Sequence, residues 1–445
     1  MKHLILLTFL TLLPFCLTKA ENNDSITSLG NLKLKTSNTS WSNYNPERGF
    51  FQKAFTDPSD PRFMITNEDE TFTFGIGGTF RMTTYYDICG AVAGEKFSTY
   101  NIPVPTEYRG RVGLSVESSN IYFKSKAKIG KHDLIAVVKI KSNTNEGIVL
   151  DKAYASYGGL TVGKVYSFFM DLAAGITTVD LQGPNTQIDH SVPLIGYTFD
   201  VGKHFTIGAS IEKPAYTFPE LSEYNITIGE DHQSMPDFVG KVVYRNTFGH
   251  LQAAGLFRNM NYKSSYSTII SHGVKEEHVR HNSVTGFGAA LSGHINITRK
   301  SFASFQSFYG KGIADYVNDL ENKYLSMHYV QLPIVGSTPK YSLEASPVWG
   351  TYVGYQYDFS KKFTMSAVYG FVKLYNNDSN FVYFDNTQYA ALSGFYHIND
   401  WFMLGAEVLY GKHREYAHEN IQTGELTPAR SGGACRADIM FSYTF

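Results

Sequence analysis

From Thr71 onward, hydrophobic and polar residues alternate along the chain with a period of two. In the first such stretch Phe72 and Phe74 fall on one face, and Arg81 falls on the other. This alternation is typical of a β-strand with one apolar face. It predicts sixteen strands, at residues 71–85, 112–129, 134–141, 148–157, 160–166, 192–199, 204–212, 238–245, 251–258, 284–297, 301–309, 348–359, 363–372, 389–398, 401–411 and 434–445.

The second predicted strand changes phase in its middle. Val112 and Leu114 put the apolar face on even positions, whereas Phe123 and Ile129 put it on odd positions. A change of this kind indicates either a β-bulge or a tight turn. The bulge is favoured, because it keeps the number of strands even.

The connections between the predicted strands alternate in length. Residues 201–203 and 360–362 are short, as periplasmic turns are, whereas residues 214–236, 259–283 and 310–347 have the length of external loops. Sixteen strands with this pattern predict an all-β fold, a transmembrane antiparallel β-barrel. The barrel must close, because an open sheet edge in lipid would leave backbone groups without hydrogen bonds.

One connection is different in kind. Between the strands at 160–166 and 192–199 lie about two dozen residues that neither alternate nor repeat. Compact domains rarely keep so long an irregular connection unless it has a function. We expect this segment to fold into the lumen and to form the constriction of an outer-membrane pore.

The two ends of the chain indicate the compartment. Residues 1–20 combine a basic start, an apolar run and small residues at the cleavage positions, and are therefore predicted to be a signal peptide. The alternating chain end finishes on Phe445, which resembles the signal for insertion into the outer membrane of Gram-negative bacteria. Residues 21–70 are polar and turn-rich, with at most one short helix at residues 46–55, and their role as a periplasmic tail, plug or oligomerisation arm stays open. The barrel is expected to comprise residues 71–445.

Composition agrees with this prediction. The chain has 31 Tyr, 32 Phe and 39 Gly, which suits strands that are apolar on one side and carry aromatic girdles. A net charge of −1 argues against nucleic acid as a partner. After removal of the signal peptide only Cys89 and Cys435 remain, and whether they pair cannot be read from their spacing.

Several segments resemble the DcaP-like porins, a family of trimeric sixteen-strand outer-membrane channels. They include residues 77–87, the strand running into the predicted constriction at 158–171, and the run Asp180-Leu181-Gln182-Gly183-Pro184 inside it; residues 236–244, 249–259 and 309–320 match as well. The resemblance implies a homotrimeric channel that favours anions. Where the family tends to place arginine before the constriction, this chain has Asp151-Lys152.

Charges that line the narrow part of a pore determine its selectivity. Alternation assigns a lumen-facing position to Arg81 and to lysines that oppose apolar residues on neighbouring strands. The predicted pore-lining residues are Arg81, Lys124, Lys126, Lys128, Lys139, Lys141, Lys164, Asp171, Asp180 and Lys241. Asp171 and Asp180 lie in the constriction segment and either face the lysines or fix the loop through its backbone amides.

The function predicted from these residues is diffusive passage of small hydrophilic solutes, with a preference for anions such as dicarboxylates. Outer-membrane lipids are the expected surroundings, and no cofactor or metal is predicted. The alternatives are a transporter for hydrophobic substrates, a barrel enzyme and an adhesin. No GxSxG or HExxH motif favours an enzyme, and the polar cluster His272, Glu276, Glu277, His278 and His281 is expected to be a solvated loop surface.

Overall fold

The computed structural model describes residues 28–29, 32–36, 61, 63–108, 110–117, 119–143, 146–217, 221–223, 226–269, 275–332, 340–375, 383–419 and 426–445. The predicted signal peptide, the predicted helix at 46–55 and His272 lie outside these residues. In the described ranges, no helix is both long enough and apolar enough to cross a bilayer.

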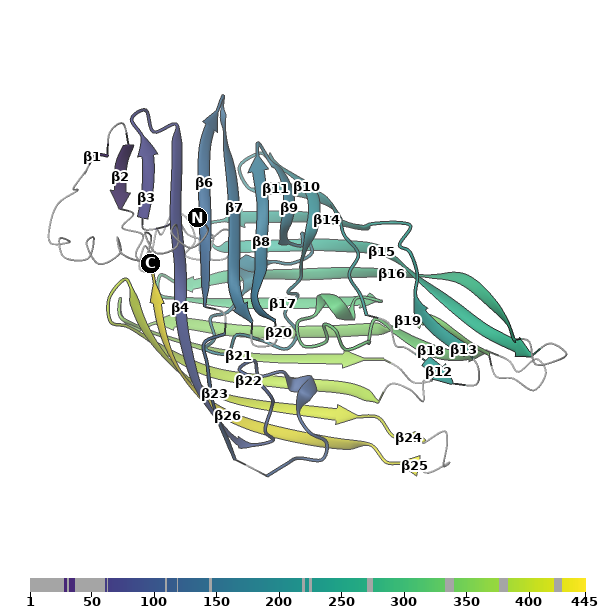
Figure 1. Ribbon diagram of the computed structural model, residues 1–445. Coiled ribbons are helices and arrows are strands. Elements are labelled where there is room, and N and C mark those ends of the chain that lie inside the picture. Colours follow the sequence, from purple (N-terminus) through teal and green to yellow (C-terminus); the bar gives the residue numbers. More distant parts are fainter. Residues whose placement is uncertain are drawn as a thin grey trace, which may run out of the picture.

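Within the described residues, sixteen antiparallel strands form a closed barrel (Figure 1). Each strand pairs with the next along the chain, and the last strand pairs with the first. The barrel strands are β4 (Phe72–Cys89), β6 (Asn120–Ile129), β7 (His132–Asn143), β8 (Gly147–Tyr157), β9 (Leu160–Tyr166), β10 (Ser191–Val201), β11 (Phe205–Glu212), β14 (Asp237–Asn246), β15 (Gly249–Ile269), β16 (Lys275–Thr298), β17 (Ser301–Lys311), β20 (Pro347–Asp358), β21 (Phe363–Leu374), β22 (Phe384–His397), β23 (Phe402–Glu415) and β26 (Arg430–Thr444). The predicted barrel and its strand number are confirmed.

Shorter elements extend this sheet or fill its loops. The additional strands are β1 (Ser28–Leu29), β2 (Leu32–Thr36), β3 (Phe63–Asn67), β5 (Arg111–Ser115), β12 (Leu221–Glu223), β13 (Ile226–Glu230), β18 (Met327–Leu332), β19 (Lys340–Ala345), β24 (His418–Glu419) and β25 (Leu426–Thr427). Three short 3₁₀ turns are η1 (Thr99–Asn101), η2 (Leu172–Ala174) and η4 (Ala314–Tyr316). β3 pairs with the beginning of β4 and β2 pairs with β3, so a meander continues the sheet at the short-turn end.

The phase change in the second strand is a β-bulge, as predicted. β5 and β6 both pair with the same edge of β4, where Thr83 is opposite Ser115 and Thr79 is opposite Asn120. The four residue steps from Thr83 to Thr79 on β4 therefore lie opposite five residue steps from Ser115 to Asn120, so the segment that joins β5 and β6 has one extra residue. The Ser119 hydroxyl fills the gap, accepting a hydrogen bond from the Arg81 N–H and donating one to its carbonyl.

Burial along the strands is inverted relative to a water-soluble protein. On β23 and β26, Glu407 and Asp438 are 3% and 2% exposed, whereas their apolar neighbours Val408 and Ile439 are 58% and 65% exposed. A continuous apolar outer surface of this kind needs a non-aqueous partner. The outer face of the barrel is therefore suited to lipid, and the polar face is turned to the interior.

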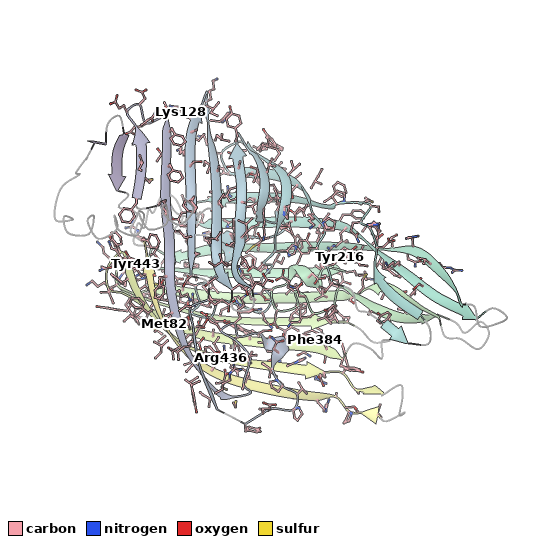
Figure 2. All side chains as sticks on the ribbon, in the orientation of Figure 1. Met82, Lys128, Tyr216, Phe384, Arg436 and Tyr443 are labelled. Atoms are coloured by element: carbon pink, nitrogen blue, oxygen red, sulfur yellow. The ribbon has the colours of Figure 1, made fainter. Side chains whose placement is uncertain are left out.

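Aromatic side chains gather at the short-turn end of the barrel. Trp401 and Tyr443 stack with ring centroids 6.1 Å apart, and Tyr443 and Phe445 stack at 5.9 Å. Figure 2 shows Tyr443 at this end and Met82 farther along the wall. Such a girdle marks the level at which a membrane surface meets a barrel.

Two predicted loops differ from the structure. Residues 259–283 are largely strand rather than loop, because β15 and β16 continue as a hairpin that projects beyond their neighbours (Figure 1). Residues 310–347 do not extend outward throughout, because residues 312–326 turn into the barrel and bury Ile313, Val317 and Leu320. Met260 and Tyr262 explain the long hairpin, since they pack with β18 and β19 in a small apolar cluster.

Cys89 and Cys435 face each other across the seam between β4 and β26. Both thiols are free in this structure. The seam at which the barrel closes thus brings together the two cysteines that lie outside the predicted signal peptide.

A constriction inside the barrel

The connection between β9 and β10, residues 167–190, lies inside the barrel and is called the constriction loop below. Its path follows the inner wall. The Phe168 N–H donates to Glu212 Oε1 at 2.9 Å, and the Tyr352 hydroxyl donates to the Ala174 carbonyl at 2.9 Å. These two anchors lie on β11 and β20, which are separated by four strands of the wall. The predicted inward fold is confirmed.

The tip of the constriction loop is held by a buried carboxylate. Glu407 on β23 accepts hydrogen bonds from the N–H groups of Val179 and Asp180, at 2.8 and 2.7 Å. On the neighbouring side of the tip, Arg81 donates to the Val179 carbonyl. The loop also approaches the wall closely at Gly405, where an added Cβ would lie 2.8 Å from the Val179 side chain. The close approach at Gly405 and the separate backbone contacts of Arg81 and Glu407 therefore fix this turn.

Two further segments complete the constriction. The inward segment, residues 312–326, forms a bridge from Val317 to Ile188, and the Asn318 side chain donates to the carbonyls of Gln182 and Pro184 at 2.6 and 3.0 Å. The first loop, residues 90–108, contributes a hydrogen bond from the Phe97 N–H to Asp180 Oδ1 at 3.0 Å.

Asp319 joins the inward segment to the first loop. Its carboxylate accepts hydrogen bonds from the hydroxyls of Ser98 and Thr99, at 2.8 and 2.5 Å, and from the Tyr100 N–H at 3.1 Å. Burial raises the pKa of Asp319 to about 6, although these hydrogen bonds favour its charged form. The three segments therefore form one hydrogen-bonded body within the lumen.

Asp171 and Asp180, both predicted as pore-lining, are buried and tied into this body. Asp171 accepts from the Ala173 N–H and the Ser292 hydroxyl, at 3.1 and 2.6 Å, and lies 3.0 Å from His250 Nε2. Asp180 accepts from the Gln182 N–H and the Tyr389 hydroxyl, both at 3.1 Å, and burial raises its pKa. The sequence left open whether these aspartates face the lysines or fix the loop. Their contacts are those of residues that fix the loop.

The lysines of β6 and β7 form a column on the lumen wall, which we call the lysine ladder. Strand pairing arranges it in steps of two residues, from Lys128 at the short-turn end through Lys126 and Lys124 to Lys139 and Lys141. Four steps of about 6.7 Å give a length of about 27 Å along the strands. Figure 2 shows Lys128 at the end of β6.

The orientation of the ladder follows from its neighbours. Lys124 shares a face with the buried Tyr122 and lies opposite the buried Val137. Phe123 and Val138, one position away on each strand, are exposed on the outer face. The ladder therefore points inward.

A second β-bulge places two consecutive charged residues inside the pore. The pairing of β7 with β8 shifts between Lys139 and Ile140, so Asp151 and Lys152 are both buried on the inner side. Asp151 lies among three amines, at 3.3 Å from Lys139 Nζ, 3.1 Å from Lys141 Nζ and 3.5 Å from Lys152 Nζ. One carboxylate thus compensates only part of the local positive charge.

The net charge of this part of the wall follows from the ladder lysines, Lys152 and their carboxylate partners. Lys126 also has a carboxylate partner, Asp133 at 2.9 Å. The five ladder lysines and Lys152 carry six positive charges, and Asp133 and Asp151 carry two negative ones, so these eight side chains have a net charge of +4.

Acidic groups on the loops face this wall and were not identified from the sequence. Burial raises the pKa of Asp189, and Lys152 and Lys141 oppose this shift by attraction, whereas Glu321 reinforces it by repulsion. Asp189 is the last but one residue of the constriction loop, and Glu321 belongs to the inward segment. Lysines on the wall and carboxylates on the loops therefore share one electrostatic environment. The sequence predicts an external loop at residues 310–347, so only the fold shows that Glu321 lies close to Asp189 inside the barrel.

The remaining predicted pore-lining residues differ in position. Lys241 is on the inner face of β14, with its amine 4.2 Å from the centre of the Phe168 ring. Lys164 shares a face with the exposed Leu160 and Val162, and its amine donates to the Leu150 carbonyl at 2.8 Å. The structure therefore places Lys164 on the outer face and not in the lumen, because the constriction loop turns inward only after Tyr166.

Comparison with known proteins gives the family. A family model of the Porin subfamily matches residues 83–430, which is more than half of the chain. The chain belongs to the Porin subfamily. No curated protein sequence matches this porin.

Solved structures agree in fold. This porin resembles the outer membrane channel DcaP of Acinetobacter baumannii with a TM-score of 0.64 and 16% identity, over 85% of this chain and 99% of that chain. It also resembles the trimer form of OmpT, an outer membrane protein of Vibrio cholerae, with a TM-score of 0.52 and 12% identity, over 84% of this chain and all of that one. The predicted porin family and the location in the Gram-negative outer membrane are confirmed, and the fold is shared with the DcaP channel. Family and fold point to a channel and not to an enzyme.

Proposed function

We propose that this porin gives diffusive passage to small hydrophilic solutes and favours anions, dicarboxylates in particular. The lysine ladder is the observation that carries the proposal. It presents amines along about 27 Å of wall, and two acidic residues of the constriction loop, Asp171 and Asp180, accept hydrogen bonds from N–H groups of the loop itself.

A dicarboxylate fits this arrangement better than a monovalent anion. Consecutive ladder positions are about 6.7 Å apart along the strands, so the two carboxylates of one small molecule can approach neighbouring amines together. Lys139 and Lys141 lie on either side of Asp151, which keeps the site from binding an anion so tightly that it cannot leave.

The test is the reversal potential of the purified protein in a planar bilayer under a tenfold KCl gradient. An anion-selective potential is expected, together with faster uptake of a C4 dicarboxylate than of a diamine of equal length into liposomes. A cation-selective potential would contradict the anion preference and leave the channel itself intact.

We further propose that the protein works as a homotrimer in contact with outer-membrane lipids. Support comes from the apolar outer face and from the trimer form of OmpT, whose fold this chain shares. Single-channel recording should show closures in three equal steps. Closures in a single step would indicate a monomeric channel.

Residues 21–70 are proposed to lie on the periplasmic side, before the barrel of residues 71–445. The proposal is supported by the pairing of β3 (Phe63–Asn67) with the first residues of β4 at the short-turn end. Protease added to intact cells should leave an epitope placed before Phe63 uncut, and cleavage there would contradict this location.

A further inference from the structure

The seam between β4 and β26 has a β-bulge next to its two cysteines. Arg436 pairs with Asp87, whereas the preceding residue Cys435 pairs with Cys89. One residue step on β26 therefore lies opposite two residue steps on β4, and Ile88 is the extra residue of the bulge.

The bulge places both cysteines on the same face of the wall. Arg436 is fully buried on the inner side of β26, so the adjacent Cys435 faces outward. On β4 the fully buried Asp87 faces inward, and strict alternation would turn Cys89 inward as well. The extra residue Ile88 reverses this alternation, so Cys89 stands beside Cys435.

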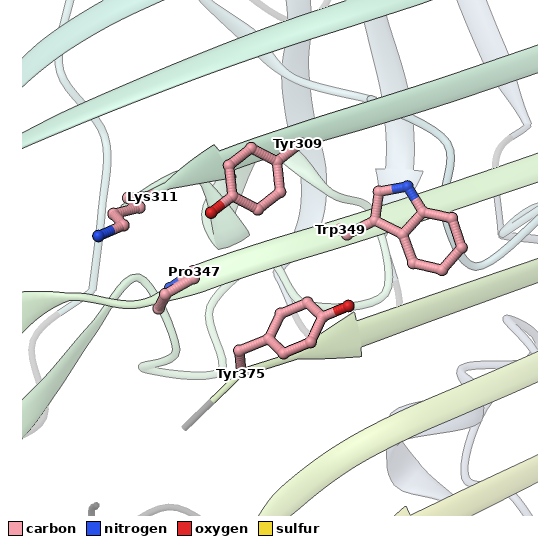
Figure 3. Close-up of a pocket in the computed structure, with 5 residues that line it drawn as sticks. All are labelled: Tyr309, Lys311, Pro347, Trp349 and Tyr375. Carbon is pink, nitrogen blue, oxygen red and sulfur yellow. The ribbon is translucent and has the colours of Figure 1, made fainter. Parts of the chain in front are cut away.

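The side chains of Cys89 and Cys435 are in contact. Their thiols hydrogen-bond to each other, and both residues are half-buried. Residues that lie directly opposite in an antiparallel pair, such as Tyr309 and Trp349 in the surface pocket of Figure 3, have Cα atoms about 4.5–5.5 Å apart. A disulfide needs about 4.4–6.8 Å between its Cα atoms, so the pairing across the seam meets this requirement.

The backbone next to Cys89 is held close to β26. Gly90, the following residue, has a φ of +62°, a conformation that suits glycine. A Cβ added to Gly90 would lie 2.2 Å from the Gly433 carbonyl oxygen, and the Gly90 N–H donates to the Glu107 carbonyl at 2.6 Å. On the other side of the cysteines, the Arg436 side chain lies 2.6 Å from Asp87. These contacts keep the two sulfur atoms opposite each other.

We propose that Cys89 and Cys435 form a disulfide that closes the seam of the barrel covalently. The oxidant is a protein disulfide of the periplasm, an oxidising compartment that the chain crosses before insertion. The thiolate of Cys435 attacks this disulfide and forms a mixed disulfide, and the thiolate of Cys89 then displaces the remaining sulfur of the oxidant. The two cysteines lose two protons and two electrons, and the oxidant leaves as a dithiol. Only one pairing within the chain is available, because the third cysteine, Cys16, lies in the predicted signal peptide.

The disulfide also fixes the beginning of the first loop, residues 90–108. Cys89 directly precedes this loop, and Arg436, the neighbour of Cys435, donates to the Val92 carbonyl at 2.7 Å. Because the first loop belongs to the hydrogen-bonded body in the lumen, the bond connects the outer side of the wall to the constriction.

Thiol counting on the full-length protein tests the pairing. Protein extracted from outer membranes in N-ethylmaleimide, which blocks free thiols, is denatured, reduced and treated with a maleimide-polyethylene glycol tag. The unchanged protein should take two tags, whereas C89S and C435S should take none, because their single thiol is already blocked. An unchanged protein without tags would show that its thiols are free and would overturn the proposal. A disulfide-linked dimer of the unchanged protein on a non-reducing gel would overturn it as well, because the bond would then join two chains.

Heat-induced unfolding in SDS, followed on gels by the mobility of the folded barrel, tests the closure of the seam. Reduction should lower the temperature of half-unfolding by about 5 °C or more, because the first and last strands are then free to separate. The double variant C89S/C435S is the matched control, and it should unfold at the temperature of the reduced protein with or without reductant. An unchanged temperature in the reduced protein, or a response of the double variant to the reductant, would overturn the closure of the seam by this bond.

Discussion

Reversing the charge of the lower part of the lysine ladder should convert an anion preference into a cation preference. The change is the triple replacement of Lys124, Lys126 and Lys128 by glutamate. These three lysines occupy consecutive inward positions of β6, and Lys126 lies 2.9 Å from the carboxylate of Asp133. The triple replacement changes the charge of the eight-residue wall from +4 to −2.

The size of the effect follows from Coulomb's law. An ion about 7 Å from a unit charge in water interacts with it by about 0.6 kcal/mol, and about half of this energy remains at 0.1 M salt. Each lysine-to-glutamate change moves the local charge by two, and it acts in opposite directions on chloride and potassium. The permeability ratio of anion to cation should therefore fall about sevenfold for each changed lysine close to the ion path.

The assay is the reversal potential under a tenfold KCl gradient, for which a perfectly selective pore gives about 59 mV of either sign. The control replaces Lys131, Lys203 and Lys361 by glutamate. These lysines lie in turns at the same end of the barrel, so the total charge changes equally but outside the lumen. The potential should change sign in the ladder variant and stay unchanged in the control.

Two outcomes would refute this reasoning. If both variants shift the potential equally, the net charge of the mouth determines selectivity and the ladder has no special role. If neither variant shifts it, ions pass too far from β6 for these amines to matter.

Three other changes test other parts of the site. D151N removes the carboxylate between the amines and should raise the anion preference about threefold, again read from the reversal potential; an unchanged potential would place Asp151 away from the ion path. E407A leaves the buried N–H groups of Val179 and Asp180 unpaired and should lower unfolding stability by about 2–6 kcal/mol, with noisier open-channel current; a quiet channel would mean that other contacts hold the loop. The pKa of Asp319 in the folded state, about 6, is above its ordinary value of 3.8, so the folded protein binds this proton more tightly than the unfolded chain does. Lowering the pH from 7 to 4 should therefore increase the free energy of unfolding by up to about 3 kcal/mol relative to D319N. Parallel melting curves of the two proteins across this pH range would contradict that assignment.

The barrel could be predicted from the sequence because lipid and lumen impose a period of two on every strand that crosses the membrane. The same reason explains why the projecting part of β15 and β16 was predicted as loop. Beyond the membrane both faces of the hairpin are hydrated, so no alternation is imposed there, and apolar residues such as Met260 and Tyr262 follow instead the cluster that they form with β18 and β19.

The inward segment was missed although a signal is present. Ile313, Val317 and Leu320 are apolar residues in a connection expected to be exposed to water, and all three are fully buried. The position of Asp151 was beyond prediction, because alternation would have placed it on the face opposite Lys152. Only the bulge in the pairing with β7 turns both of them inward.

The contacts of the constriction loop also constrain how the molecule is assembled. Its anchors come from both ends of the chain, with Arg81 on the first barrel strand and Glu407 on the last but one. The inward segment that braces it is synthesised well after it. A nascent barrel that has not yet met its final strands therefore lacks the acceptors for the tip of this loop, and the pore acquires its working diameter only when the seam between β4 and β26 closes.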